Sequence, residues 1–432
     1  MSDTAASASA APAPNPAPAG AARDPQAIAR RLKKRYAAER RFRWLGLGAV
    51  LFSFAVLAFL LFTMSANGIG GFQRAELKAE IDLSTGALTV DPSQVSGTDA
   101  VRVLEGAGLP DVVTFALSRS GIDQRAVAEL DPDAWREVAK RLIAQPALLS
   151  QKFTVSLPVS DTLAAALRGE GDPALQQVAR RLQAEGKLVR AWDWGFFSRA
   201  DATHAQSVGI WGALKGSILT MAVTLALAFP IGVLSAVYLE EYAPRNRWTD
   251  LIEVSINNLA AVPSIIFGLL GLAVFLTVFP HWRSAPLIGG MTLALMTMPV
   301  IVISGRNAIK AVPPSIRDAA LGIGASRVQV VFHHVLPLAL PGILTGTIIG
   351  MARALGETAP LLMIGMRAFV GSAPEGLTSP SSVLPVQIFL WSDEIDRGFV
   401  QRTSAAIIVL LLFLLAMNGL AIYLRNRFEK RW

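Results

Sequence analysis

Six long apolar runs are the feature that most limits what this sequence can fold into. A helix of about 20 apolar residues crosses the roughly 30 Å hydrocarbon core of a bilayer and satisfies its own backbone hydrogen bonds there. We therefore predict an all-α polytopic membrane protein with six transmembrane helices. The runs cover residues 44–64, 216–239, 259–279, 285–304, 338–366 and 405–424.

The composition agrees with this prediction and excludes several classes of soluble protein. Of the 432 residues, 52% are hydrophobic and 17% are charged, whereas an average soluble domain is about 25% charged. Cysteine is absent, which excludes a disulfide framework, a cysteine zinc site, an iron–sulfur cluster and a thiol nucleophile. The four histidines lack the spacing of metal ligands, so we expect no metal site.

The net charge of +8 has two interpretations. In a soluble protein it would suggest a nucleic-acid partner, whereas in a membrane protein basic residues collect on the cytoplasmic side. With a cytoplasmic N-terminus, segments 1–43, 240–258, 305–337 and 425–432 are cytoplasmic, and together they carry 19 basic and 9 acidic residues. We therefore expect both termini in the cytoplasm and no nucleic-acid partner.

Differences in composition divide the chain into four parts. Residues 1–43 are predicted to be a disordered basic cytoplasmic tail, followed by the first transmembrane helix at 44–64. Residues 65–205 have ordinary composition and are predicted to form a small α+β extracytoplasmic domain, and 206–432 form the main transmembrane domain. The elements expected in the extracytoplasmic domain are a hairpin over 76–90, helices over 123–144 and 173–186, and a strand over 153–157.

The loop at 306–337 has the start and stop signals of two short helices. Pro314 marks a helix start, and Asp318 close behind it suits the positive end of the helix dipole. Gly324 predicts a break, after which a second short helix is expected over 326–335. Such a loop is a rigid protrusion that another protein can approach closely.

This loop resembles the EAA loop of bacterial ABC importer permeases, in which Glu-Ala-Ala is followed by Gly and then by an apolar residue before x-Leu-Pro. The matching residues, at the same spacing, are Asp318, Ala319, Ala320, Gly324, His334, Leu336 and Pro337. Asp318 keeps the usual negative charge, whereas His334 replaces the apolar residue. The resemblance implies that the loop fits a separate ATP-binding subunit and couples ATP hydrolysis to gating. This chain, which has no G-x-x-x-x-G-K-[ST] loop, is then expected to bind no cofactor itself.

Three further stretches resemble the phosphate importer permeases of the PstA type. They are YLEEYAP at 238–244, NNLAAVPSIIFGLLGL at 257–272 and RALGETAPLL at 353–362. The resemblance implies the ABC importer permease fold, a place in the bacterial inner membrane, and assembly with a PstC-type permease, two ATPase subunits and a periplasmic phosphate-binding protein. Some members of that family look similar in carrying an extra domain after the first helix, which would account for residues 65–205.

Arg353 and Glu357 are charged residues inside the fifth apolar run. Four residues apart, they are expected to share one helix face, and a charge in mid-bilayer costs at least about 2.5 kcal/mol unless it faces a wet cavity or a partner. The guanidinium fork matches phosphate oxygens, and the PstA resemblance implies that this arginine takes part in phosphate passage. We predict that Arg353, Glu357 and Thr358 line the substrate path; the alternative is a pair that only stabilises helix packing.

Gly342, Gly346 and Gly350 form a stripe of small residues on the same run. Such a stripe lets two membrane helices approach closely. Its partner is either another helix of this chain or a second permease subunit. Pro263 and Pro360 are expected to bend the third and fifth spans.

These observations predict the transmembrane subunit of an ATP-driven inorganic phosphate importer, not an enzyme. An importer of another oxyanion, such as sulfate, molybdate or phosphonate, is the alternative of the same class. A membrane sensor would need a signalling module, and the sequence contains none. A proton-coupled transporter would leave the EAA-like spacing unexplained.

Overall fold

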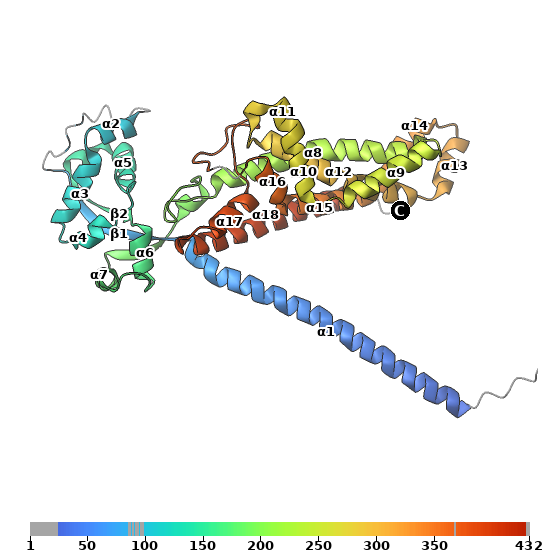
Figure 1. Cartoon of the computed structure of the whole chain (residues 1–432), viewed down its shortest axis with the longest axis horizontal. Coiled ribbons are helices and arrows are strands. Elements are labelled where there is room, and N and C mark those ends of the chain that lie inside the picture. The colour runs from blue at the N-terminus through green and yellow to red at the C-terminus, as the bar shows by residue number, and fades with distance from the viewer. Residues whose placement is uncertain are drawn as a thin grey trace, which may run out of the picture. The chain divides into compact units, whose positions relative to one another are not determined.

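The structure is a computed structural model, and in its described part the chain is mostly helical with one small sheet (Figure 1). Residues 25–84, 88, 90, 95, 99–366 and 369–428 are described. Five helical segments in this part of the chain are long and apolar enough to cross a membrane, and the bent pair α9 and α10 makes a sixth if it is one span. The prediction of a helical polytopic membrane protein is therefore confirmed, although the third span differs in shape.

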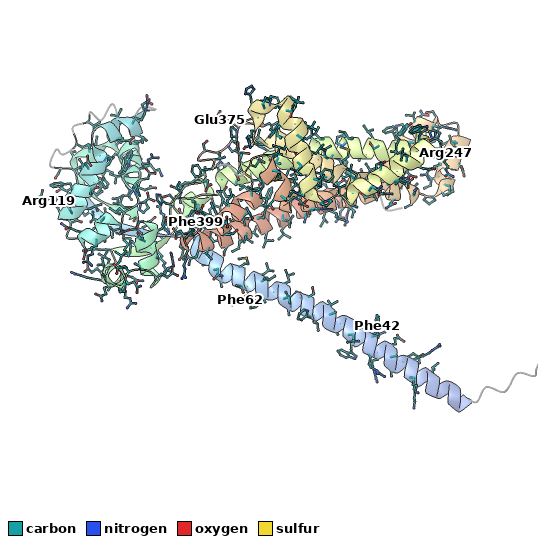
Figure 2. All side chains as sticks on the ribbon, in the orientation of Figure 1. Phe42, Phe62, Arg119, Arg247, Glu375 and Phe399 are labelled. Atoms are coloured by element: carbon teal, nitrogen blue, oxygen red, sulfur yellow. The ribbon has the colours of Figure 1, made fainter. Side chains whose placement is uncertain are left out.

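Helix α1 (Pro25–Gly71) is much longer than the predicted first span at 44–64. The prediction of a disordered tail is wrong from Pro25 onward, because the Ala, Arg, Lys, Glu and Leu residues before the apolar run are good helix formers and extend the helix. The rest of that predicted tail lies outside the described residues. Phe42 and Phe62 project from the surface of α1 (Figure 2).

A small α+β fold follows α1. Its antiparallel sheet has the order β2–β1–β3, with β1 (Gln73–Asp82) between β2 (Lys152–Pro158) and β3 (Leu188–Trp192). Alternate side chains of β1, from Ala75 to Ile81, are buried in one core with the helices. Those helices are α2 (Ala100–Gly106), α3 (Leu109–Arg119), α4 (Gln124–Ala128), α5 (Trp135–Ala144), α6 (Asp161–Leu167) and α7 (Pro173–Ala184).

The elements expected in this fold are found with two differences. The strand expected at 153–157 lies in β2, and the helix expected at 173–186 is α7. The single helix expected over 123–144 is instead the pair α4 and α5, because Pro132 between them cannot continue a helix. Half of the second arm of the expected hairpin, residues 87 and 89, lies outside the described residues.

A buried arginine joins this fold to the helices that follow. Arg402 is 2% exposed, and its guanidinium donates to the carbonyl oxygens of Gly71 (2.7 Å) and Ala205 (2.8 Å) and to the Asp193 carboxylate (3.1 Å). Removing one partner of such a buried charged pair is costly, because it leaves the other charge uncompensated. The contact fastens the end of α1 and the end of the sheet to the last long helix.

The remaining helices form the membrane-spanning part, in which α8 and α15 both pack on α12. The third predicted span, 259–279, is not one straight helix. The chain bends by 105° between α9 and α10, because Pro263 lacks an N–H and its ring displaces the carbonyl four residues earlier. The helices are α8 (Trp211–Val237), α9 (Arg247–Ala260), α10 (Ser264–Leu270), α11 (Leu276–Val278), α12 (Pro286–Lys310), α15 (Leu336–Gly356), α16 (Ala359–Met363), α17 (Leu384–Ser392) and α18 (Gly398–Phe428).

The glycine stripe lies in the contact between α15 and α12. A Cβ atom added at Gly342 would lie 2.6 Å from the Cβ of Ala308, and one added at Gly346 would overlap the Ser304 side chain. Gly350 approaches α12 in the same way. The stripe therefore packs against another helix of this chain, which decides between the two partners left open by the sequence.

We expect Gly346→Ala to lower the midpoint of thermal unfolding in detergent by several degrees, because overpacking a close helix contact typically costs about 1–3 kcal/mol. The matched control is Gly419→Ala, where no atom lies within 4 Å of the added Cβ. Combining Gly346→Ala with Ser304→Gly should restore the midpoint. Equal midpoints for Gly346→Ala and wild type would contradict the close contact.

Candidate functional site

Arg353 and Glu357 lie where the helix of the fifth apolar run breaks. Helix α15 ends at Gly356, and Glu357 has left the helical conformation with a ψ of 123°. The expectation that the two share one helix face is wrong, because the ring of Pro360 would collide with the carbonyl of Gly356, four residues earlier. The break still brings the charges together, with Arg353 Nε 3.4 Å from Glu357 Oε1.

The surroundings of this pair are asymmetric. The Arg353 side chain is 49% exposed, whereas that of Glu357 is 19% exposed. Arg353 is in the last turn of α15, where the helix dipole favours a cation. Thr358 follows the pair as the N-terminal residue flanking α16 and is half-buried. Because lipid cannot solvate a guanidinium, the exposed side of Arg353 needs water, an anion or a protein partner.

Buried hydroxyls that the sequence analysis missed lie behind the same segment. Ser217 and Thr220 on α8 line a small cavity of about 10 Å³ together with Ala354 and Leu355. The Ser217 hydroxyl oxygen accepts a hydrogen bond from the Leu384 backbone N–H at 2.9 Å. Among the described residues, the Thr220 hydroxyl has no hydrogen-bond partner. The cavity walls thus include the two residues directly after Arg353.

Ser381 and Ser382 extend this group. Both side chains are buried, and neither hydroxyl has a hydrogen-bond partner in the described part of the chain. They lie against α8 at Gly216, where an added Cβ would come within 3.0 Å of Ser381 Oγ. Leaving a hydroxyl buried and unpaired costs roughly 1–3 kcal/mol. We call Ser217, Thr220, Ser381 and Ser382 the hydroxyl cluster.

The loop at 306–337 folds into helix α13 (Pro314–Gly322), a turn and helix α14 (Arg327–Gln329). Gly324 has a φ of +86°, a conformation that favours glycine, and the N–H of the next residue, Ala325, donates to Ala320 O at 3.1 Å. The predicted break at Gly324 is therefore confirmed. Ala320 is buried under this turn, whereas Asp318 and Ala319 are exposed.

Two expectations about this loop are wrong. Asp318 is the fifth residue of α13 and lies beyond its first turn, so it gains little from the helix dipole. The second helix does not end near Leu336 and Pro337 but runs on into α15, giving one helix from Arg327 to Gly356. A wide turn over Val330–Val335 accommodates Pro337, whose ring would otherwise collide with the preceding turn.

The tip of the loop exposes apolar side chains. Leu321, Ile323, Val328 and Phe332 are between 44% and 84% exposed. His334, which departs from the family pattern, is also exposed and does not enter the core of the loop. An exposed apolar group of this kind typically marks a protein contact.

Ion pairs that the sequence analysis also missed fix the base of the loop. Arg317 on α13 lies 2.7 Å from Glu241 and also donates to the Ile309 and Val312 carbonyl oxygens. The signal for this anchor was the two adjacent glutamates in the YLEEYAP stretch, which follow an apolar helix. They end that helix with charges that bind the loop.

Arg306 makes a second anchor beside the first. It pairs with Glu240 and, at 2.7 Å, with Glu253 on α9, while Lys310 lies 3.4 Å from Glu240. The ends of α8 and α12, the start of α13 and helix α9 are thereby held together by charge.

Comparisons with known proteins match two parts of the chain to known families. Residues 29–177 match a domain of unknown function (DUF3333), and residues 228–432 match the binding-protein-dependent transport system inner membrane component. The probable ABC transporter permease protein YqgI of Bacillus subtilis is 31% identical over 205 residues, covering 45% of this chain and 69% of that protein. The phosphate transport system permease protein PstA of Haemophilus influenzae is 30% identical over 232 residues, covering 54% and 81%. An inward-facing MetNI methionine ABC transporter structure is 17% identical with a TM-score of 0.42, covering 51% of this chain and 98% of that one.

We expect Glu241→Ala to free α13 from its base, because the Arg317 guanidinium loses its carboxylate partner. Hydrogen exchange of the amides in α13 should become several-fold faster, while amides in α12 keep their protection. Asp250→Ala is the control, since Asp250 is exposed on α9 and makes no ion pair among the described residues. Unchanged exchange in α13 would show that the ion pair does not hold the loop.

Proposed function

We propose that this chain, which belongs to the PstA-type family of binding-protein-dependent permeases, forms part of the membrane path of an importer. The importer is driven by ATP and carries phosphate. The chain is an integral membrane protein and a permease subunit of an ABC importer. The PstA relatives are named as phosphate transport permeases. We propose phosphate as the substrate of this chain as well.

The proposal rests on Arg353, whose side chain is half exposed. A guanidinium presents a planar donor fork that can bind two oxygens of a phosphate at once. Glu357, 3.4 Å away, compensates the charge when no anion is bound. The lower exposure of Glu357 leaves the guanidinium as the group offered to a ligand. A pair that served only packing would have both partners buried against other helices.

The continuous helix from Arg327 to Gly356 supports a coupling mechanism. Its 30 residues span about 45 Å at 1.5 Å per residue, with the loop at one end and Arg353 at the other. A partner ATPase that binds the exposed loop tip and moves it would displace this helix as one body. That displacement would change the surroundings of Arg353 and so alternate access to the phosphate site.

Partners and orientation follow from the same proposal. The loop tip and its ion-pair anchors face the cytoplasm, where two ATPase subunits bind, and both termini lie on that side. A PstC-type permease supplies the other half of the path, facing the exposed side of Arg353. A periplasmic phosphate-binding protein delivers the substrate from the opposite side, on which the α+β domain lies.

In a strain lacking this chain, wild type should restore uptake of labelled phosphate, whereas Arg353→Ala and Arg353→Lys should each lose most of it. Lysine keeps the charge but not the fork, so it separates phosphate binding from charge balance. The control is Arg247→Ala, an exposed cation on α9 with no ion pair among the described residues. Full uptake by Arg353→Lys at normal membrane levels would show that Arg353 and Glu357 only stabilise helix packing. Stronger inhibition by sulfate or molybdate than by unlabelled phosphate would reassign the substrate.

We propose that the hydroxyl cluster also lines the path, because the unpaired Thr220 hydroxyl can donate to a phosphate oxygen. Thr220→Val should then reduce phosphate uptake several-fold. It should not lower the thermal unfolding midpoint, because valine keeps the shape and removes an unpaired buried hydroxyl. Thr224→Val is the matched control on the same helix. The Thr224 hydroxyl already donates to Thr220 O at 2.9 Å, so its loss should cost stability and leave uptake per folded molecule unchanged. Equal uptake by Thr220→Val and wild type would exclude the hydroxyl cluster from the path.

A further inference from the structure

The central strand of the sheet has one edge that is only partly paired. Strand β2 pairs with β1 from Glu76 to Asp82, whereas β3 pairs with it only from Gln73 to Leu77. In the described part of the chain no backbone group pairs with the β3 side of residues 79–82. An open strand edge presents free N–H and C=O groups and can accept another strand.

The direction of the backbone groups confirms where this open edge lies. The Lys78 N–H donates to Lys187 O at 2.7 Å, at the point where β3 begins. Backbone groups alternate sides along a strand, so those of Glu80 and Asp82 point the same way as those of Lys78. No backbone partner of these groups is found among the described residues.

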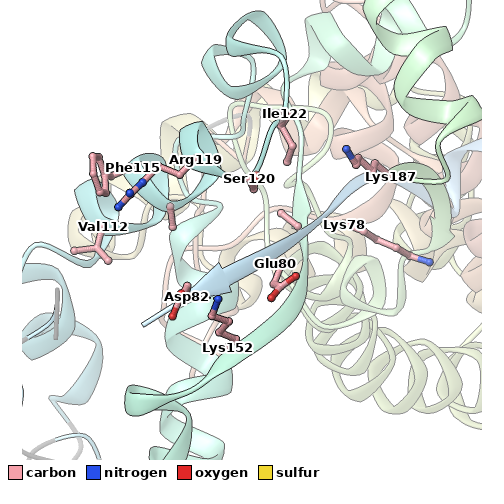
Figure 3. A pocket seen from close by; sticks show the side chains of 12 residues that line it. Lys78, Glu80, Asp82, Val112, Phe115, Arg119, Ser120, Ile122, Lys152 and Lys187 are labelled. Atoms are coloured by element: carbon pink, nitrogen blue, oxygen red, sulfur yellow. Dashed lines mark ion pairs between the residues drawn. The ribbon is translucent and has the colours of Figure 1, made fainter. Parts of the chain in front are cut away.

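A groove of about 520 Å³ runs along this edge (Figure 3). Helix α3 forms the opposite wall with Val112, Phe115 and Ala116. Phe115 is 60% exposed, and the Arg119 guanidinium lies 5.6 Å from the centre of its ring. The groove thus combines a line of backbone hydrogen-bonding groups with an apolar wall, which is the arrangement that binds an extended peptide.

The charge of the groove opposes that of the domain around it. Four cations and two carboxylates line it, although residues 65–205 as a whole carry 15 basic and 18 acidic residues. Lys152 is paired with Asp82 at 3.0 Å, and Lys187 with Glu185 outside the groove. Lys78 and Arg119 have no ion pair among the described residues and are available to a ligand's carboxylates.

We propose that this groove binds an extended acidic peptide segment of another protein, which adds to the open edge of β1 as a further strand. The open edge of four residues, 79–82, is about 13 Å long, so it fits a short extended segment. Side chains of the added strand alternate between the apolar wall of α3 and the face that carries Lys78. The segment that fits therefore alternates apolar and acidic residues. This inference does not depend on what the permease transports.

The test uses the full chain in detergent and a fluorescein-labelled peptide, Val-Glu-Val-Glu-Val-Glu-Val, with binding followed by fluorescence anisotropy. Saturable micromolar binding is expected. Two altered peptides, one with Lys in place of Glu and one with alternate backbone amides N-methylated, should bind at least about tenfold more weakly, since each removes one class of contact. Equal binding of the N-methylated peptide, or no binding of the first peptide, would overturn the proposal.

Variants of the chain provide a second test of the proposal. Combining Lys78→Glu with Arg119→Glu should weaken binding of the Glu peptide at least about tenfold by charge repulsion. The control is Arg180→Glu, an exposed charge reversal on α7 outside the groove. Circular dichroism and the unfolding midpoint check that each variant is folded. If size-exclusion chromatography shows a dimer that the double variant abolishes, the groove belongs to a second copy of the chain, and the proposal is wrong.

Discussion

The close contact between α15 and α12 is the interaction on which the membrane part of this structure depends. Glycines at four-residue spacing bring the two helices together at distances that a single methyl group would disturb. Hydrophobic burial does little to hold helices together in lipid, so close packing of small residues takes its place. This contact positions the helix that carries the loop at one end and Arg353 at the other.

Prolines decide where the long helices bend, widen or stop. The same chemistry has a different outcome at each position: a sharp bend at Pro263, a widened turn before Pro337, and a helix end before Pro360. At Pro337 the helix continues through the widened turn. Where Gly356 precedes the proline by four residues, the helix ends and two charged residues are left at the break.

The buried arginines in the described part of the chain are paired with carboxylates, and Arg353 differs from them. Arg306, Arg317 and Arg402 each bind a carboxylate and are largely buried. Arg353 is the contrasting case, since it touches Glu357 yet stays half exposed on an apolar helix. The hydroxyl cluster lies behind the same segment, and three of its four hydroxyls have no hydrogen-bond partner among the described residues.

The sequence by itself determined the class of protein, because runs of 20 apolar residues, small-residue spacing and the spacing of Asp318, Gly324 and Pro337 are local patterns. It also identified Arg353 and Glu357, since charges inside an apolar run are conspicuous. Only the tertiary structure decided that the glycine stripe meets α12, that Glu240 and Glu241 anchor the loop, and that Ser217 and Thr220 lie beside Ser381 and Ser382. These contacts join residues up to about 170 positions apart, and hydrogen bonding or packing over such separations leaves no periodic trace in the sequence. The open edge of β1 was also decided only by the tertiary structure, because it exists only where β3 ends before β2.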